Sequence, residues 1–228
     1  MTTALITGGA GRFGQAIGQR LIADGYFVVL ADKDEKAAQA AAATLGEAHA
    51  AAAFLDVTKT EGLRGKVDEL VRRHGAIDAL VNAAGGRQGA DYGPFLSNDP
   101  AQWRPIMDLH LRGVLNCCYA VLPHMIAAKR GSIVSLVAVE GLRGDPAGAV
   151  FSAAKGGIIV LAKAMVRELR PHGIRINTVV PANADALAWS GSQDDAADVA
   201  EAVAYLTSER AKQITGACLD VTGGWSLH

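Results

Sequence analysis

The chain has 228 residues, 50% of them hydrophobic, and a formal net charge of −1 at pH 7. This length and composition are enough to bury a sizeable core, and we expect a single domain over residues 1–228. A charge so close to zero provides no basic surface for nucleic acid or for an anionic membrane, so neither is expected as a partner.

Apolar runs alternate with helical patterns along the whole chain, which predicts an α/β fold with a parallel sheet and helices on both faces. In the first helix Phe13, Ile17 and Leu21 recur every four residues and form an apolar stripe that faces the sheet. The alanine run at 37–43 predicts a closely packed helix. The predicted strands are 4–7, 27–31, 51–55, 79–82, 132–136, 175–179 and 217–221.

Two longer helices are predicted at about 101–128 and 149–171, and both are apolar on more than one face. A helix that is apolar nearly all round needs cover on a second side. Either another subunit provides that cover, or the two helices pack deeper within the monomer.

The beginning of the chain and its cysteines point to an ordinary reduced protein. Met1-Thr2-Thr3 leads directly into a strand without the regions of a signal peptide, and no apolar run approaches the roughly 20 residues that span a bilayer. Cys117 and Cys118 are neighbours on a helix and match no metal or redox spacing. We therefore expect a cytoplasmic protein without a metal site and without contact with a membrane.

Six segments in order resemble the short-chain dehydrogenase/reductase (SDR) superfamily. They are TGGAGRFG at 7–14, LVNAAG at 80–85, GSIV at 131–134, KGG at 155–157, RINTVVP at 175–181 and ITGACLDVTGGW at 214–225. The resemblance implies a single-domain, Rossmann-type, doubly wound parallel sheet of about seven strands, with a nicotinamide dinucleotide at its edge. It also implies that helices 101–128 and 149–171 meet their counterparts in a dimer or tetramer.

The glycine-rich turn departs from the common pattern of the family. Gly8 permits the tight turn from strand to helix, and a middle glycine lets backbone N–H groups approach the pyrophosphate. That middle glycine is Gly11, followed by Arg12 and Phe13 and then by Gly14, a spacing that resembles the extended branch of the superfamily. The alternative is that the Arg12 side chain occupies the phosphate path.

Asp32 ends the second predicted strand, 18 residues after Gly14. A carboxylate there accepts hydrogen bonds from the adenosine ribose and repels a 2′-phosphate, which favours NAD(H) over NADP(H). The alternative is a simple turn residue, because Asp-Lys-Asp also begins turns and helices. By resemblance, the other cofactor-binding positions are Asp56, Val57, Asn82, Ala83, Gly85 and Lys155.

Of the four catalytic positions of the family, only Lys155 is retained. The tyrosine position holds Phe151, and the serine position, three residues before Gly141, holds Ala138. Neither side chain can form a hydrogen bond. His110 occupies the place of an asparagine that holds a relay water, and some active hydroxyacyl-CoA dehydrogenases of the family also carry histidine there.

Two further features bear on chemistry. Ser135, Ser152 and Glu140 are polar, but we expect them to point away from the substrate oxygen. The helical lid of the family is nearly absent, because a stretch of only about 182–194 follows the sixth strand; its Trp189 either plugs the opening or contacts a partner.

Three functions remain open. The first is a catalytically inactive SDR subunit with a structural or regulatory role beside an active dehydrogenase. The second is an NAD-dependent oxidoreductase, acting on an alcohol, ketone or hydroxyacyl substrate with a non-standard proton donor such as His110 or water, or else a repurposed lyase or isomerase. The third is an ordinary oxidoreductase whose two hydroxyls were removed by engineering.

Overall fold

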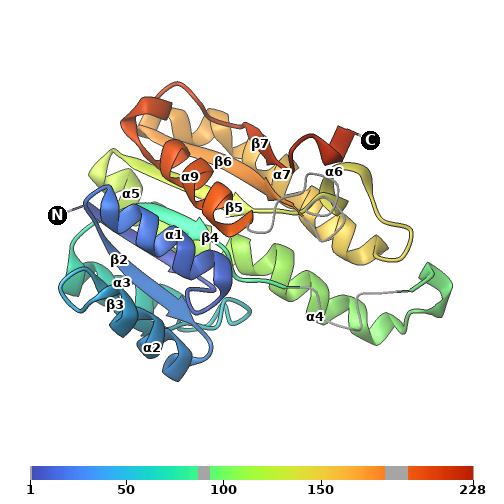
Figure 1. The fold of residues 1–228 in the computed structure, drawn as a ribbon, viewed down its shortest axis with the longest axis horizontal. Coiled ribbons are helices and arrows are strands. Elements are labelled where there is room, and N and C mark those ends of the chain that lie inside the picture. The colour runs from blue at the N-terminus through green and yellow to red at the C-terminus, as the bar shows by residue number, and fades with distance from the viewer. Residues whose placement is uncertain (1, 87–92, 183–194, 228) are drawn as a thin grey trace.

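The computed structural model describes residues 2–86, 93–182 and 195–227. Seven parallel strands form one sheet in the order β3-β2-β1-β4-β5-β6-β7 (Figure 1). The predicted number of strands and their parallel direction are confirmed. The strands are β1 (Thr2–Thr7), β2 (Tyr26–Asp32), β3 (Ala50–Phe54), β4 (Ile77–Asn82), β5 (Gly131–Leu136), β6 (Ile174–Pro181) and β7 (Cys218–Val221).

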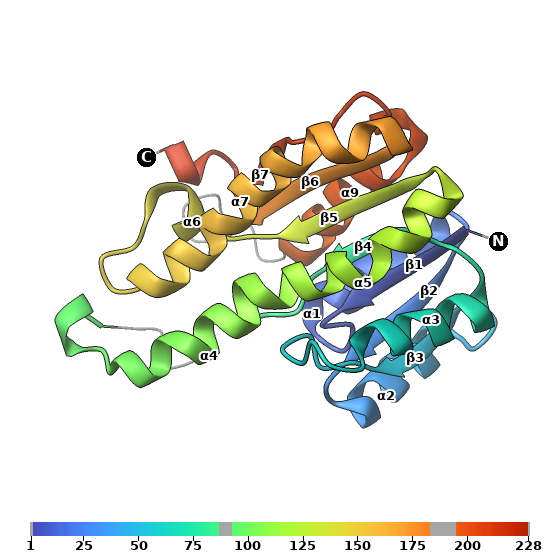
Figure 2. The same ribbon diagram turned by 180° about the vertical axis from the view of Figure 1, so that it is seen from behind.

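Helices cover both faces of this sheet, as predicted (Figures 1 and 2). One face carries α1 (Arg12–Ala23), α2 (Glu35–Leu45) and α9 (Asp195–Thr207). The opposite face carries α3 (Leu63–His74), α5 (Gly113–Ala128) and α7 (Ala149–Leu169). Two short helices, α4 (Trp103–Met107) and α6 (Glu140–Arg143), lie near the carboxyl ends of the strands.

The alternation of side chains along each strand divides the core in two. In β1, Leu5 faces the core beneath α3, α5 and α7, while its neighbour Ile6 faces the core beneath α1, α2 and α9. Both are at most 1% exposed. Successive strand side chains point to opposite faces, and both faces are buried here, so the strands read as continuous apolar runs.

The helix predicted at 101–128 is interrupted. A 3₁₀ turn at Pro100–Gln102 precedes α4, and a π-helical turn at Asp108–Arg112 separates α4 from α5. Such turns are rare and often lie at functional sites. The π-helical turn carries His110. The apolar periodicity of the sequence did not reveal this turn, because it looks the same as that of a regular helix.

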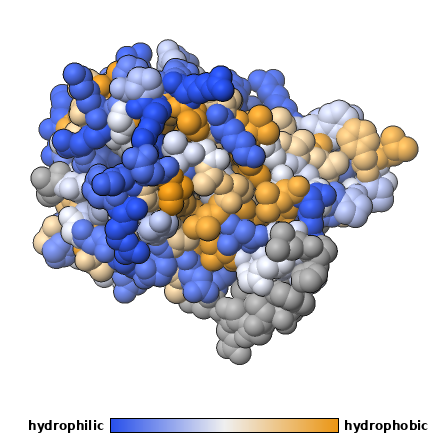
Figure 3. Space-filling model, turned by 90° about the horizontal axis from the view of Figure 1, so that it is seen from above, coloured by the Kyte–Doolittle hydropathy of each residue, from blue (hydrophilic) through white to orange (hydrophobic). Residues whose placement is uncertain are grey.

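The segment that leads into α4 forms an arm that projects from the body of the molecule (Figures 1 and 2). On this arm the ring of Phe95 stacks on the ring of Trp103, with the two ring centroids 5.3 Å apart. Leu96 is 96% exposed. Figure 3 shows the end of the arm as hydrophobic surface.

Two helical stretches, Pro100–Ala128 and Ala149–His172, are long and apolar enough to cross a membrane by length and composition alone. The expectation that no stretch approaches this length was therefore wrong. The reason is that α5 and α7 are apolar on their outer faces as well as on the faces that pack on the sheet. Helices that form the core of a soluble protein pass the same test, so the finding is weak evidence for a membrane span.

The turn after β1 is held tightly against the end of β4. Gly8 has a φ of +65°, and a Cβ at this position would lie 2.7 Å from the carbonyl oxygen of Ala83. Only glycine fits such a turn. Because β1 has β2 on one side and β4 on the other, the crossover connections diverge here, and such a point is where open α/β sheets bind ligands.

Candidate functional site

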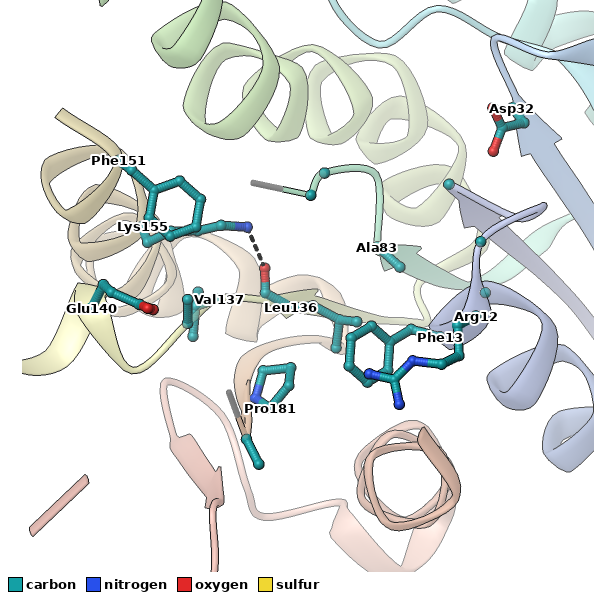
Figure 4. Close-up of a pocket in the computed structure, with 17 residues that line it drawn as sticks. Arg12, Phe13, Asp32, Ala83, Leu136, Val137, Glu140, Phe151, Lys155 and Pro181 are labelled. Atoms are coloured by element: carbon teal, nitrogen blue, oxygen red, sulfur yellow. Dashed lines mark hydrogen bonds between the residues drawn. The ribbon is translucent and has the colours of Figure 1, made fainter. Parts of the chain in front are cut away.

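Two adjoining cavities of about 640 and 440 Å³ open at the carboxyl ends of the strands. Figure 4 shows the residues that line the first of them. The two cavities share Gly8, Asp32 and Gly85 in their walls. The second cavity also contains Asp56, Val57 and His110. The first brings together most of the other predicted site residues, namely Gly11, Arg12, Phe13, Gly14, Ala83, Ala138, Phe151 and Lys155.

Asn82 is the predicted position that the structure does not bring to either cavity wall. Its side chain is 3% exposed, and its Nδ2 donates a hydrogen bond to Ser135 Oγ at 3.0 Å. Asn82 thus links β4 to β5 beneath the site. Its side chain supports the site from the interior of the fold.

The amino terminus of α1 points into the first cavity. Its cap residue Gly11 provides no side-chain hydrogen bond, and the first turn contains no acidic residue. The first backbone N–H groups of a helix have no partner within the helix, and together with the helix dipole they attract an anion. The turn from Gly8 to Gly14 therefore has the form of a phosphate-binding loop.

The side chain of Arg12 lies beside this loop and contacts both Asp195 and Phe13. Its guanidinium forms an ion pair with the Asp195 carboxylate at the beginning of α9. It also lies over the Phe13 ring, with its central carbon 4.7 Å from the ring centroid. The Asp195 side chain is 2% exposed, which makes it a strong anchor for a half-exposed arginine. Sequence reasoning missed Asp195, since nothing local marks a partner 183 residues away.

Asp32 ends β2 as predicted, and its carboxylate accepts hydrogen bonds from the neighbouring backbone. Its Oδ2 accepts a hydrogen bond from the backbone N–H of Ala10 at 3.2 Å, and its Oδ1 accepts one from Asp34 at 3.1 Å. The carboxylate thereby fixes the glycine-rich turn. Each carboxylate oxygen can accept more than one hydrogen bond, so Asp32 remains able to accept from a ligand in either cavity.

Lys155 and Phe151 lie next to each other in the wall of the first cavity (Figure 4), and His110, in the wall of the second, packs against Phe151. Lys155 follows Phe151 by one turn of α7, and its Nζ donates a hydrogen bond to the backbone oxygen of Leu136 at 3.2 Å. Nζ lies 5.7 Å from the centroid of the Phe151 ring. His110 packs edge-on against the same ring at 4.9 Å.

Burial alters the protonation of both nitrogen-containing side chains. It lowers the pKa of His110 to about 3, with a further contribution from the charge of Lys155. Burial also lowers the pKa of Lys155 to about 8, although the nearby Glu140 carboxylate opposes the change. The site therefore combines a neutral imidazole with an amine that loses its proton unusually easily.

Of the three polar residues expected to point away from the site, Glu140 does not. It is 6% exposed and lines the first cavity, because the short helix α6 turns it inward. Ser135 Oγ accepts the hydrogen bond from Asn82 and lies beneath the cavities, as expected. Ser152 Oγ is buried and has no hydrogen-bond partner among the described residues. The expected shortened lid lies in residues 183–194 and is outside the described residues, together with Trp189.

Comparison with known proteins identifies the family. Residues 2–198 match the sequence model of the family described as short chain dehydrogenase. The chain is 31% identical to the 3-oxoacyl-[acyl-carrier-protein] reductase FabG of Staphylococcus epidermidis, over 97% of this chain and 98% of that protein. It is 33% identical to the meso-2,3-butanediol dehydrogenase of Serratia marcescens, over 96% and 92% of the two chains.

Among solved structures, a gluconate 5-dehydrogenase from Burkholderia cenocepacia in complex with NADP and tartrate superposes with a TM-score of 0.91 at 28% identity. The match covers 100% of this chain and 96% of that one. The chain belongs to the short-chain dehydrogenase/reductase family.

The lowered pKa of His110 predicts a specific sensitivity to acid. Below about pH 6.5 the unfolded chain takes up a proton at His110, whereas the folded protein does not until about pH 3. Stability is therefore lost as the pH falls through this range, at up to about 1.4 kcal/mol per pH unit. Urea unfolding at pH 7, 5 and 4 should show a smaller loss for His110→Asn than for the unmodified protein. The exposed His49 provides the matched control: His49→Asn should keep the original acid sensitivity, and equal losses in all three proteins would contradict the prediction.

Proposed function

We propose that this chain binds a nicotinamide dinucleotide, preferably NAD(H), but is a catalytically inactive member of its family with a structural or regulatory role. Its partner in that role would be an active dehydrogenase subunit, in the cytoplasm. The observation that carries the proposal is the contrast within one cavity. The phosphate loop and Lys155 are retained there, while Ala138 and Phe151 present no group that can donate a proton.

Nucleotide binding is supported by the helix terminus, the shape of the cavities and the position of Asp32. The two cavities adjoin at Gly8 and Asp32, as an elongated ligand with a central pyrophosphate would require. The contacts of Arg12 with Asp195 and Phe13 argue against the alternative in which Arg12 occupies the phosphate path. The structural relative from Burkholderia holds NADP. The preference for NAD(H) rests on the Asp32 carboxylate, which would repel a 2′-phosphate.

Loss of catalysis follows from the chemistry of hydride transfer. A hydride that leaves or joins a carbinol carbon must be matched by a proton transfer at the oxygen, which contributes about 10²–10⁴ in rate. Phe151 has no proton to transfer, and Ala138 cannot stabilise the substrate oxygen. His110 is buried and neutral at pH 7, so it is a poor proton donor.

Assembly through the outer faces of α5 and α7 is part of the proposal. Large apolar side chains lie exposed on these helices, with Tyr119 66% and Val160 65% exposed. Exposed apolar patches of this kind mark interaction surfaces. We propose a dimer or tetramer, with a second copy or with an active relative, that covers these two helices.

We expect NAD(H) to bind at least about tenfold more tightly than NADP(H), a difference of about 1.4 kcal/mol. Calorimetric titration of both nucleotides tests this. Asp32→Asn retains an acceptor for the Ala10 N–H but removes the charge, so it should abolish the preference. Asp34→Asn, on a residue that caps α2 outside both cavity walls, should leave the preference unchanged. Stronger binding of NADP(H) would contradict the role of Asp32, and failure of both nucleotides to bind would point to obstruction by Arg12.

The purified chain should show no appreciable NAD-dependent oxidation of meso-2,3-butanediol or gluconate, nor reduction of 3-oxoacyl thioesters. One missing donor of this kind commonly costs 10²–10³ in turnover, and here two are missing. Ala138→Ser combined with Phe151→Tyr should produce measurable turnover if the pockets are otherwise intact. Phe54→Tyr, at the exposed end of the edge strand β3, is the matched control and should produce none. Turnover by the unmodified chain would instead support an oxidoreductase with another proton donor. If the His110→Ala variant then lost this turnover, His110 would be assigned as the proton donor.

The assembly should be larger than a 23.6 kDa monomer in light scattering at micromolar concentration. Val160→Asp would place an unpaired charge in the proposed interface at a cost of several kcal/mol, so this variant should dissociate. Because Val160 is exposed in the isolated chain, the folded monomer should survive the change. Phe54→Asp, on an edge strand away from α5 and α7, should leave the assembly intact. A monomeric unmodified protein would overturn this part of the proposal, unless mixing with an active relative restores assembly.

A further inference from the structure

The buried amine of Lys155 has chemistry available that does not involve hydride transfer. Lys155 is 6% exposed, lies in the wall of the 640 Å³ cavity and is the amine-bearing residue among the described lining residues. We propose that Lys155 is a nucleophile that forms an imine with a carbonyl ligand, a small aldehyde or ketone with an apolar substituent, inside this cavity. The protein would thereby hold such a ligand covalently and reversibly.

The first support is a small space beside Gly85, which lies next to both Lys155 Nζ and His110 Nδ1. A methyl group built on Gly85 would lie 3.7 Å from Lys155 Nζ and 3.4 Å from His110 Nδ1. His110 is 2% exposed, and its Nδ1 has no hydrogen-bond partner within the described part of the chain. A buried polar atom without a partner is costly, and a ligand oxygen in this space would satisfy it. The carbon bonded to that oxygen would then lie within reach of Nζ.

The second support is the apolar surroundings of the amine. The Phe151 ring lies beside Nζ, and Leu136, Val137 and Ala138 line the same cavity. A tyrosine hydroxyl at position 151, or a serine hydroxyl at position 138, would add polar groups to this wall. Their replacement by Phe and Ala leaves a wall that suits an alkyl or aryl substituent, with the amine exposed to the ligand.

The third support is the state of the amine itself. Burial lowers the pKa of Lys155 to about 8. At pH 7 about one amine in ten is then unprotonated, against fewer than about one in 10³ for an ordinary lysine with a pKa of about 10.4. A lysine desolvated in an apolar pocket is a recognised form of activated amine nucleophile.

The reaction is balanced without an oxidant or a cofactor. The Nζ lone pair forms a bond to the carbonyl carbon as the C=O π bond breaks, and one N–H proton passes to the oxygen, which gives a neutral carbinolamine. The second N–H proton then passes to the hydroxyl, the C–O bond breaks so that water leaves, and the nitrogen lone pair forms the carbon–nitrogen double bond. Amine and carbonyl become imine and water. A neutral imidazole has one nitrogen that donates a hydrogen bond, so His110 can hold the carbonyl oxygen in place while the protons pass from nitrogen to oxygen.

Reduction of the imine with borohydride tests the proposal in the intact protein. The protein would be incubated briefly with butanal at pH 7, reduced with sodium borohydride, and digested for peptide mass spectrometry. We expect alkylation of Lys155 at least about tenfold above that of the exposed Lys163 and Lys129, because far more of the Lys155 amine is unprotonated than in an ordinary lysine. This mapping uses the unmodified protein and does not depend on whether any variant folds. Equal or lower labelling of Lys155 would overturn the proposal.

Two further measurements separate a reactive amine from a merely accessible one. The rate of labelling at Lys155 should level off near pH 8, whereas that of free N-acetyl-lysine should continue to rise towards its pKa of about 10.4. Lys155→Met should abolish the selective label, and the matched Lys163→Met should leave it in place. A rate at Lys155 that follows N-acetyl-lysine across the whole pH range would contradict activation by the cavity.

Discussion

The close approach of the Gly8 turn to the end of β4 is the constraint on which the site depends. The backbone at Gly8 lies so near the Ala83 carbonyl that no side chain fits between them. This contact brings the amino terminus of α1 to the point where the crossovers from β1 and β4 diverge. The two cavities meet there and share Gly8, Asp32 and Gly85. Because all seven strands are parallel, the groups at their carboxyl ends, with Lys155 on the adjoining α7, collect at this one edge.

Desolvation dominates the electrostatics around Lys155 and His110. It disfavours a proton on both side chains, so His110 is neutral at pH 7, while Lys155 still carries its proton in most molecules but loses it at a lower pH than an ordinary lysine. The pKa of Lys155 is lowered from its ordinary value, so burying the charged form reduces stability below about pH 8, and that loss disappears as the pH rises towards 10.5. A stability cost of this kind is what a functional site commonly carries, since an apolar residue at position 155 would avoid it.

The strands and their parallel direction could be anticipated because apolar runs and turn residues are local signals, and the family motifs mark the glycine turn, Asp32 and Lys155. The remaining features depend on contacts that no local pattern contains. The ion pair of Arg12 joins residues 183 positions apart, and the π-helical turn that holds His110 has the same apolar periodicity as a regular helix. Glu140 lines the first cavity from a four-residue helix, an element too short for a residue pattern to reveal.

Phe151 connects the two properties proposed for this cavity. The ring keeps the shape of the tyrosine that the family resemblance leads one to expect, so the packing against His110 survives without the hydroxyl. Removing the hydroxyl removes the proton that a dehydrogenase needs, and it also removes a polar group that would hydrogen-bond the neighbouring amine or orient its proton. On both proposals, the phenylalanine at position 151 would favour amine chemistry over hydride chemistry in this cavity. Lys155 would then act through its amine, and a non-catalytic dehydrogenase fold and a carbonyl-binding site are compatible proposals for the same chain.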